Sequence, residues 1–265
     1  MKKSVFKDNV TIITGASFGI GRQLALQLAS HGAWLVLAAR SVERLEEVSR
    51  QCNQRGGKAI VIPTDVTDQP QCKNLIEGTI AAYGRIDTLI NNAGIGTDAR
   101  FGQLQDLKVF EKVFRTNFFG SVYCTFYALP YLKETRGRLA GVSSLRGVLP
   151  SGRANGYGAS KHAMAGFFDS LRNEVGKSGV SVTMIYPGWV STGISGRALR
   201  ADGTPRERIS RLENGAMPED VCARMIIKAV ASRKRQVVMT TLGKLGVVGK
   251  LMVPGIVDHF VRKYT

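Results

Sequence analysis

The chain has 265 residues, of which 44% are hydrophobic and 22% charged, a composition typical of a globular protein with material for a sizeable core. Its formal net charge is +17, but the Lys and Arg residues are spread along the whole chain without a nucleic-acid-binding signature, so no nucleic-acid partner is expected. The four cysteines lie far apart without a CxxC pair, which argues against a metal site or a disulfide framework.

Strand and helix patterns alternate from the N-terminus onward. Apolar runs predict strands at 9–15, 33–40, 58–65, 86–94, 137–144, 179–187 and 235–240. Helical patterns lie at 19–31, 42–55, 69–84, 107–134, 156–177 and 218–232, and the third of these is expected to start at an Asp68 cap and to end near Gly84. Continuously apolar strands are typical of a parallel sheet covered on both faces. The sequence therefore predicts an α/β protein with a doubly wound Rossmann fold, a sheet of about seven parallel strands with helices on both faces, in a single domain over 1–265.

Two segments depart from this alternation. Residues 193–215 are polar, contain glycines and follow the sixth strand, so we expect a mobile flap over the substrate. Residues 241–265 are apolar with interspersed Lys and are too broken to span a bilayer. This tail either packs against a second subunit or lies in a membrane interface. Because no signal peptide is visible, we expect a cytoplasmic protein, peripheral to a membrane in the second case.

Three glycines fall within seven residues directly after the first predicted strand, in TGASFGIG, which starts at Thr14. Here Gly15 permits a tight turn, Gly19 lets the backbone approach a pyrophosphate, and Gly21 lets the helix pack closely on the strand. The positive end of the following helix would face the phosphates. A strand, a glycine-rich turn and a helix in this order favour a dinucleotide site over a merely structural turn.

A tyrosine and a lysine stand four residues apart in YGASK, on a predicted helix. Tyr157 and Lys161 therefore share one helix face. A phenol is a poor base at neutral pH, and a nearby ammonium lowers its pKa by favouring the phenolate. Such a tyrosine can exchange a proton with an alcohol or a carbonyl oxygen. Taken alone, a Tyr and a Lys at this spacing occur mostly by chance.

Two other motifs are by themselves ordinary turn signals: NNAG at 91–94 and the Pro-Gly pair of YPGWVST at 186–192.

Together these motifs resemble those of the short-chain dehydrogenase/reductase family. TGASFGIG, NNAG, VSSLRG, YGASK and YPGWVST occur between residues 14 and 192 in the family's order and on the expected elements. Ser144 lies thirteen residues before Tyr157, which is the family's spacing and favours it over the neighbouring Ser143. The resemblance implies a catalytic set of four residues: Asn117, Ser144, Tyr157 and Lys161.

The resemblance also implies a nicotinamide dinucleotide cofactor. The residues expected to contact it are Gly15, Ser17, Phe18, Gly19, Ile20, Gly21, Asp65, Val66, Asn92, Ala93, Gly94, Tyr157, Lys161, Pro187, Gly188, Val190 and Thr192. Where NAD-binding folds carry an acid for the ribose 2′-hydroxyl, this chain has Arg40 and Ser41. These two can bind a 2′-phosphate, so NADP(H) is predicted over NAD(H). One departure is Phe18, where many NADP-preferring relatives carry a basic residue.

The implied reaction is hydride transfer from the pro-S face of the nicotinamide to a carbonyl, or its reverse from a secondary alcohol. In the reductive direction Ser144 polarises the carbonyl and Tyr157 protonates the nascent alkoxide. Lys161 holds the nicotinamide ribose and lowers the pKa of Tyr157, while Asn117 supports proton resupply. Two alternatives stay open: other chemistry on the same site, and an NADP(H)-binding regulator or redox sensor without turnover.

Three segments are expected to line the substrate pocket, 94–101, 145–153 and 189–215. They contribute the apolar residues Ile95, Leu145, Val148, Leu149 and Trp189, which indicate a lipophilic substrate, and the arginines Arg146 and Arg153, which either meet an anionic group or are solvated. The segments VSSLRG and GFFDSLRNEV resemble those of the hydroxysteroid dehydrogenase branch of the family. The family also implies a homodimer or homotetramer, formed through the helices at 107–134 and 156–177.

Overall fold

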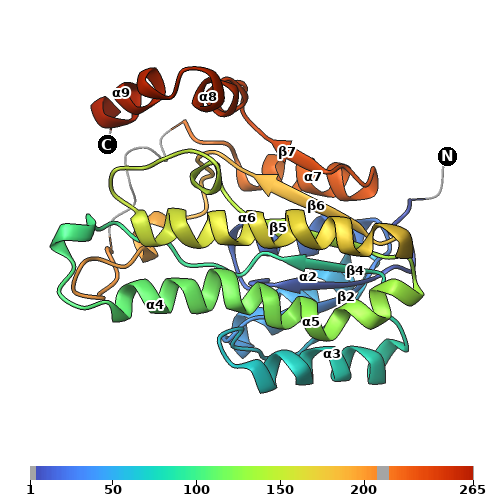
Figure 1. Ribbon diagram of the computed structural model, residues 1–265. Coiled ribbons are helices and arrows are strands. Elements are labelled where there is room, and N and C mark those ends of the chain that lie inside the picture. Colours follow the sequence, from blue (N-terminus) through green and yellow to red (C-terminus); the bar gives the residue numbers. More distant parts are fainter. Residues whose placement is uncertain (1–3, 208–214, 265) are drawn as a thin grey trace.

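The computed structural model describes residues 4–207 and 215–264. Its centre is a sheet of seven parallel strands in the order β3-β2-β1-β4-β5-β6-β7 (Figure 1). The strands are β1 (Val10–Thr14), β2 (Trp34–Ala38), β3 (Lys58–Val61), β4 (Thr88–Asn91), β5 (Arg138–Val142), β6 (Ser181–Tyr186) and β7 (Gln236–Val238). The predicted doubly wound sheet is therefore confirmed. The part of the predicted flap at 208–214 lies outside the described residues.

Helices cover both faces of the sheet. One face carries α1 (Gly19–Ser30), α2 (Val42–Gln54) and α7 (Glu219–Ala231), and the other carries α3 (Gln69–Tyr83), α5 (Gly120–Glu134) and α6 (Asn155–Val175), which lie in front in Figure 1. Ile12 of β1 packs in the core under α3, α5 and α6, while its neighbour Ile13 packs in the core under α1, α2 and α7. Because successive side chains point to opposite faces, a strand covered on both sides must be apolar at every position.

Local signals fix the ends of α3 as expected. The side chain of Asp68 accepts a hydrogen bond from the backbone N–H of Gln71 at 3.1 Å. At the other end Gly84 has φ 72°, the left-handed conformation that glycine adopts without a Cβ clash.

The helical stretch predicted over 107–134 is confirmed, but its centre is not regular α-helix. The structure has α4 (Lys108–Phe114), then a π-helical turn over Arg115–Phe119, then α5. Wide turns of this kind are most common at functional sites, because they push one residue out of the regular helical position. Here the turn contains Asn117, whose side chain is fully buried.

The strand order places a topological switch beside β1. The chain runs outward from β1 to β3, returns to β4 on the other side of β1, and then continues outward to β7. The connections that leave the carboxyl ends of β1 and β4 therefore turn away from each other and open a crevice, where ligands of doubly wound sheets bind.

The C-terminal segment forms two helices, α8 (Thr241–Met252) and α9 (Pro254–Tyr264), that stand off the sheet layers at the top of Figure 1. Glycines face the body of the protein: a Cβ on Gly243 would lie 2.7 Å from Leu145, and one on Gly246 would lie 3.0 Å from Leu149. Lys250 adds a hydrogen bond from its Nζ to the backbone oxygen of Val148 at 2.8 Å. The hairpin is thus attached to the segment that follows β5.

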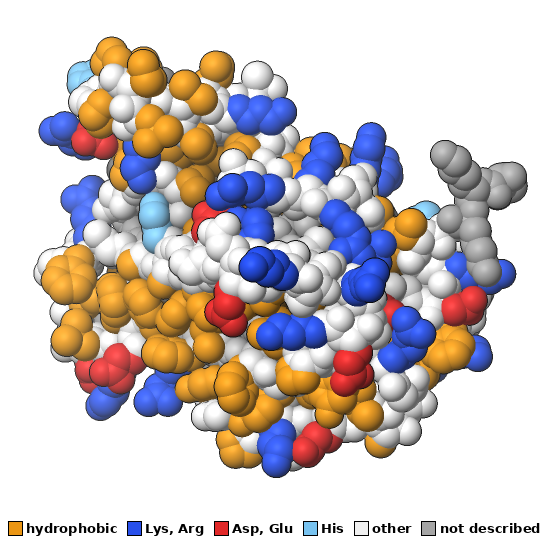
Figure 2. Space-filling model, turned by 45° about the vertical axis from the view of Figure 1, so that its right-hand side comes forward, with side chains coloured by type: hydrophobic (Ala, Val, Ile, Leu, Met, Phe, Trp, Pro, Cys, Tyr) orange, Lys and Arg blue, Asp and Glu red, His pale blue; other side chains and the backbone are white. Residues whose placement is uncertain are grey.

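The other side of this hairpin is apolar and exposed, as the orange side chains at the top of Figure 2 show. Its exposed large apolar residues are Leu242, Leu245, Val248, Leu251, Met252, Val253, Ile256 and Phe260. Leu242 is 81% exposed and Leu251 is 78% exposed, so these side chains have almost no protein contacts. Within the described residues, no helix has the length and apolarity to cross a membrane.

Candidate active site

The glycine-rich turn after β1 is tied to the end of β4 by hydrogen bonds. The hydroxyl of Thr14 accepts from the backbone N–H groups of Asn92 and Ala93, both at 3.0 Å. The side-chain amide of Asn92 donates back to the oxygens of Thr14 at 3.0 Å and of Gly15 at 3.3 Å. TGASFGIG and NNAG therefore meet across the topological switch and form one unit.

Gly15 and Gly21 make the tight turn and the close helix packing that the sequence predicts, and Gly19 shares the left-handed conformation of Gly15. Gly15 has φ 67° and Gly19 has φ 56°, both in the left-handed region. A Cβ on Gly21 would lie 2.2 Å from the backbone oxygen of Gly15, so only glycine lets α1 start this close to β1. The first turn of α1 consequently points its free N–H groups into the crevice.

Two hollows open at this edge of the sheet. The first, here called the glycine-loop cleft, encloses about 550 Å³ of empty space. It is lined by Gly15, Phe18, Gly19, Ile20, Asn92, Ala93, Gly94, Val142, Ser143, Tyr157, Lys161, Thr192 and Ile194. Ten of the expected cofactor contacts are among them, since only Val142, Ser143 and Ile194 were not predicted. A Cβ on Gly94 would lie 3.2 Å from Asn117 Oδ1 and 3.4 Å from Lys161 Nζ. Because Gly94 has no side chain, the floor of this cleft, above Asn117 and Lys161, stays open.

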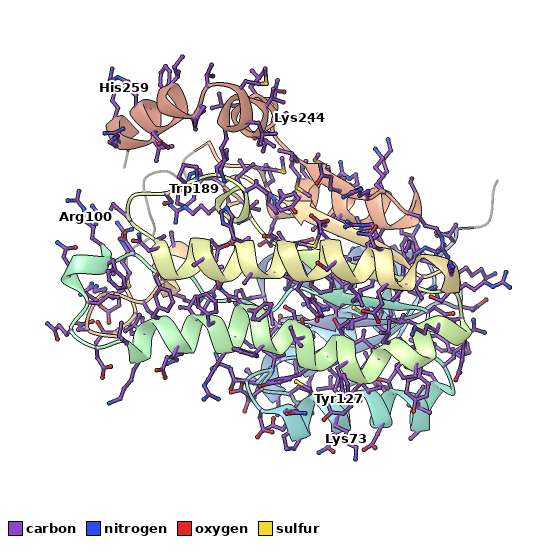
Figure 3. All side chains as sticks on the ribbon, in the orientation of Figure 1. Lys73, Arg100, Tyr127, Trp189, Lys244 and His259 are labelled. Carbon is purple, nitrogen blue, oxygen red and sulfur yellow. The ribbon has the colours of Figure 1, made fainter. Side chains whose placement is uncertain are left out.

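The second hollow, here called the Trp189 cleft, encloses about 960 Å³. Figure 3 labels Trp189, which lies between α6 and α8 in that view. Its lining is Ile20, Gly96, Thr97, Asp98, Ser143, Ser144, Leu145, Arg146, Tyr157, Pro187, Gly188, Trp189, Val190, Thr192, Ile194, Ser195, Ala198 and Arg206. Tyr157 belongs to both clefts, so a ligand in one can meet a ligand in the other beside its phenol.

The predicted pocket lining is right in part. Leu145 and Trp189 line the Trp189 cleft, but Ile95, Val148 and Leu149 do not. Leu149 instead packs under α8, where it contacts Gly246. The C-terminal hairpin therefore takes up apolar side chains that sequence reasoning assigned to the substrate.

The structure separates the two candidate serines after β5. Ser143 is buried, and its hydroxyl donates to the backbone oxygen of Lys161 at 3.1 Å. Ser144 lies at the start of a short 3-10 turn over Leu145–Gly147, and its hydroxyl is close enough to the phenol of Tyr157 to favour the phenolate. Ser144 is therefore the serine whose hydroxyl reaches the tyrosine.

The pKa of Tyr157 is raised, because burial disfavours the phenolate more than the hydrogen bond from Ser144 and the positive charge of Arg146 favour it. Lys161 is not among the groups that shift this pKa here, so its predicted lowering of the Tyr157 pKa stays a prediction. The Nζ of Lys161 lies 5.9 Å from the centre of the Tyr157 ring and donates to the backbone oxygen of Val142 at 2.8 Å. Tyr157 is thus a neutral phenol, a proton donor, at neutral pH.

Lys161 is only 3% exposed. Burial lowers its pKa from the ordinary 10.5 to about 8, since the ammonium loses its hydration. Within the described chain no carboxylate lies within 4 Å of it. A buried cation of this kind is costly for folding and is typical of a functional site.

Asn117 ties three segments together beneath these residues. Its Oδ1 accepts from the backbone N–H of Ile95 at 2.8 Å, and its Nδ2 donates to the Ile95 oxygen and to Ser160 Oγ, both at 3.0 Å. These bonds use the side chain that the π-helical turn pushes inward. Asn117 therefore joins the segment after β4 to α6, one residue from Lys161.

Several predicted cofactor residues lie outside the lining of both clefts. These are Ser17, Gly21, Arg40, Ser41, Asp65 and Val66. Arg40 is exposed just beyond the end of β2, and the hydroxyl of Ser41 donates to Glu43 at 3.1 Å. The carboxylate of Asp65 accepts from the N–H and hydroxyl of Thr67, each at 2.9 Å.

Sequence reasoning missed the charged residues that the flap contributes. The guanidinium carbon of Arg197 lies 3.5 Å from the centre of the Phe18 ring, and its Nη2 donates to the oxygen of Thr192 at 3.0 Å. Arg206 pairs with Asp98 at 2.7 Å in the Trp189 cleft. The contacts of Arg197 with Phe18 and of Arg206 with Asp98 join residues about 100 to 180 positions apart, so no local pattern predicts them.

Replacement of Lys161 by methionine is expected to stabilise the protein at pH 7 by about 2 kcal/mol, because a buried charge is removed and one hydrogen bond is lost. The folded pKa of about 8 lies below the ordinary 10.5. Between these values the unfolded chain binds more protons, so the wild type gains stability as the pH rises and the advantage of the variant declines. Urea titrations at pH 7 to 10 measure this, with exposed Lys177→Met as the control. A variant that is less stable than the wild type at pH 7 contradicts it.

Comparisons with known proteins agree with this geometry. The family model for short chain dehydrogenases matches residues 9–202. A relative from Pinus massoniana, 11-beta-hydroxysteroid dehydrogenase, is 37% identical over 264 residues, which are 97% of this chain and 74% of that protein. A Dictyostelium discoideum protein, dehydrogenase/reductase SDR family protein 7-like, is 31% identical over 99% of this chain and 83% of its own length.

A solved structure is similar over most of its length. The alcohol dehydrogenase of the archaeon Thermococcus sibiricus, complexed with 5-hydroxy-NADP, superposes with a TM-score of 0.75 at 26% identity and covers 86% of this chain and 93% of its own. Sequence, fold and the arrangement of the clefts therefore lead to one conclusion: the chain belongs to the short chain dehydrogenase family of oxidoreductases, near its hydroxysteroid dehydrogenase-like members.

Proposed function

We propose that the protein, working as one Rossmann-fold domain, is an NADP(H)-dependent oxidoreductase that transfers a hydride between the nicotinamide and the carbonyl or secondary alcohol of a lipophilic substrate. The observation that carries this is the position of Tyr157, which lines both clefts and shares the second with Ser144. A dinucleotide in the glycine-loop cleft and a carbonyl in the Trp189 cleft would then meet beside one proton donor.

The residues present fit a dinucleotide. The left-handed turn at Gly15 and Gly19, the start of α1 and the open floor at Gly94 form a cradle that a Cβ would fill. When bound, the cofactor supplies or accepts the hydride on the pro-S face of its nicotinamide. Pro187, Gly188, Val190 and Thr192 would border the nicotinamide, and Lys161 would bind its ribose hydroxyls.

The proton transfer is the work of this chain's own residues. Tyr157 is protonated at neutral pH, as a phenol with a pKa near 10 or above must be, and it donates its phenolic proton to the substrate oxygen as negative charge develops there. Ser144 donates a second hydrogen bond to the same oxygen and holds it in place. The ammonium of Lys161, 5.9 Å from the centre of the Tyr157 ring, would pass a proton to the phenolate and take one from solvent in exchange, and Asn117 would support this resupply by holding the segment after β4 against α6.

The NADP preference rests on the end of β2. Arg40 is exposed there with no acid at the neighbouring positions 39 and 41, and its planar guanidinium suits a 2′-phosphate. Arg197 places a second guanidinium over Phe18, next to the glycine-rich turn, which offsets the missing basic residue at position 18. The Thermococcus sibiricus relative, complexed with 5-hydroxy-NADP, supports the same cofactor class.

Two surfaces support the proposed assembly and location. We propose a homodimer or homotetramer through α5 and α6, because Phe119 and Phe126 of the α4–α5 region are 41% and 67% exposed. We propose that the outer face of the α8–α9 hairpin lies on an anionic lipid surface of the cytoplasm. The exposed cations Lys244, Arg262 and Lys263 outnumber the exposed carboxylate of Asp258, so the hairpin complements such a surface, and its excess positive charge would repel a second copy.

Replacement of Tyr157 by phenylalanine is expected to lower turnover about 10²- to 10⁴-fold and to leave cofactor binding intact, because only the transferable proton is lost. NADPH oxidation with a panel of lipophilic ketones and aldehydes measures the first, and fluorescence titration with NADPH the second. Tyr123→Phe on α5 is the matched control. Turnover retained in Tyr157→Phe refutes the proton-donor role, and tight NADPH binding without wild-type turnover identifies a cofactor-binding regulator instead.

Replacement of Arg40 by alanine is expected to weaken NADPH binding about 10- to 100-fold and NADH binding much less, because only NADPH offers a 2′-phosphate to the guanidinium. Parallel titrations with the two cofactors measure this. Arg44→Ala, one turn further along α2, controls for the loss of one positive charge. Equal losses of affinity for NADPH and NADH would contradict the assignment of Arg40 to the 2′-phosphate.

The double replacement Leu245→Ser and Leu251→Ser is expected to lower binding to phosphatidylserine vesicles at least tenfold, since both side chains would enter the apolar part of the interface. Co-sedimentation at low and high salt measures this, and high salt should release the wild type. The control is Val5→Ser with Val42→Ser, which replaces two exposed valines outside the hairpin. A change of oligomeric state without any vesicle binding at low salt would instead assign this face to a second subunit.

A further inference from the structure

An arginine lies in the Trp189 cleft where the substrate is expected. Arg146 follows Ser144 by two residues, and its backbone N–H donates to Ser144 Oγ at 3.2 Å. Its guanidinium carbon lies 5.0 Å from the centre of the Trp189 ring, and both side chains line the cleft. The stacked indole holds the guanidinium in place without using its N–H donors.

The other two charged residues that line this cleft, Asp98 and Arg206, are paired with each other, and Arg153, outside the lining, joins them. Asp98 accepts from Arg206 at 2.7 Å and from Arg153 at 3.2 Å, so its carboxylate is shared by two cations. Arg146 differs from both, since no carboxylate of the described residues lies within 4 Å of its guanidinium. The four side chains together carry a net charge of about +2, and the uncompensated part faces the cleft.

The cofactor does not account for this cation. Arg146 is absent from the lining of the glycine-loop cleft, where the phosphates would bind at the start of α1. Burial lowers the pKa of Arg146 somewhat, yet an arginine stays charged at any physiological pH. A half-buried guanidinium with free donors is the group that proteins use to bind a carboxylate or a similar anion in two-pronged fashion.

We propose that the substrate carries an anionic oxygen group, a carboxylate or its sulfonate or phosphate equivalent, which pairs with Arg146 while the reacting carbonyl lies at Tyr157. This rests on the proposed function and narrows it. The apolar part of the substrate lies along Leu145, Val190, Ile194 and Ala198. The substrate class is therefore an amphipathic keto acid or hydroxy acid, rather than a wholly apolar ketone.

The test compares a long-chain aliphatic keto acid with its methyl ester and with the matching keto sulfonate. Binding is read from Trp189 fluorescence in a Trp34→Phe background, with NADP⁺ bound so that no reduction takes place. We expect the wild type to bind the acid 10- to 100-fold more tightly than the ester, and Arg146→Gln to bring this ratio close to one. Arg146→Lys should keep part of the preference, and Arg224→Gln, on the outer face of α7, should keep all of it.

The sulfonate arm separates the anion classes. A sulfonate bound as tightly as the acid indicates recognition of charge alone, and a weaker one indicates a fit to the planar carboxylate; either result supports the proposal. An ester bound as tightly as the acid, or a preference that survives Arg146→Gln, overturns it.

NADPH oxidation with the same compounds distinguishes this failure from that of the proposed function. If the acid is preferred in binding through Arg146 but no compound is turned over, the anion site is supported and the reductase function is refuted. Turnover of acid and ester with equal kcat/KM supports the reductase function and refutes the proposed anion site.

Discussion

The close approach between the ends of β1 and β4 is the constraint on which the site depends. Thr14, Gly15 and Asn92 exchange hydrogen bonds across the topological switch, and Gly21 lets α1 begin against the backbone of Gly15. A side chain at this last position would push the helix away and tilt its N-terminus out of the crevice. The cofactor cradle is thus a consequence of backbone packing, and both clefts open from it.

The chemistry depends on burial as much as on proximity. Lys161 is buried as a cation, and its energetic cost is offset by the rest of the core rather than by an ion pair. Burial raises the pKa of Tyr157 in the same place, which makes the phenol a proton donor rather than a base. Arg146 and Ser144 limit this rise from the substrate side. Burial and these neighbouring groups therefore set how firmly Tyr157 holds its proton.

Much of the fold could be predicted, because a strand buried on both faces must be apolar throughout, and because Asp68 and Gly84 mark helix ends locally. The spacing of the motifs also brought Ser144, Tyr157 and Lys161 to one place. Other features depend on contacts between distant segments. The π-helical turn at Asn117 and the contact of Arg197 with Phe18 have no local signal. The sign of the Tyr157 pKa shift follows from burial, which spacing alone does not give.

In the proposed reaction one carbonyl receives a hydride from a cofactor in the glycine-loop cleft and a proton from Tyr157, which lines both clefts. The most direct test is reduction of a ketone with NADPH deuterated at the pro-S or at the pro-R position of C4, followed by mass spectrometry of the alcohol. The account predicts one deuterium at the carbinol carbon from the pro-S compound and none from the pro-R compound. Deuterium from the pro-R position, or an alcohol without deuterium in both cases, would contradict it.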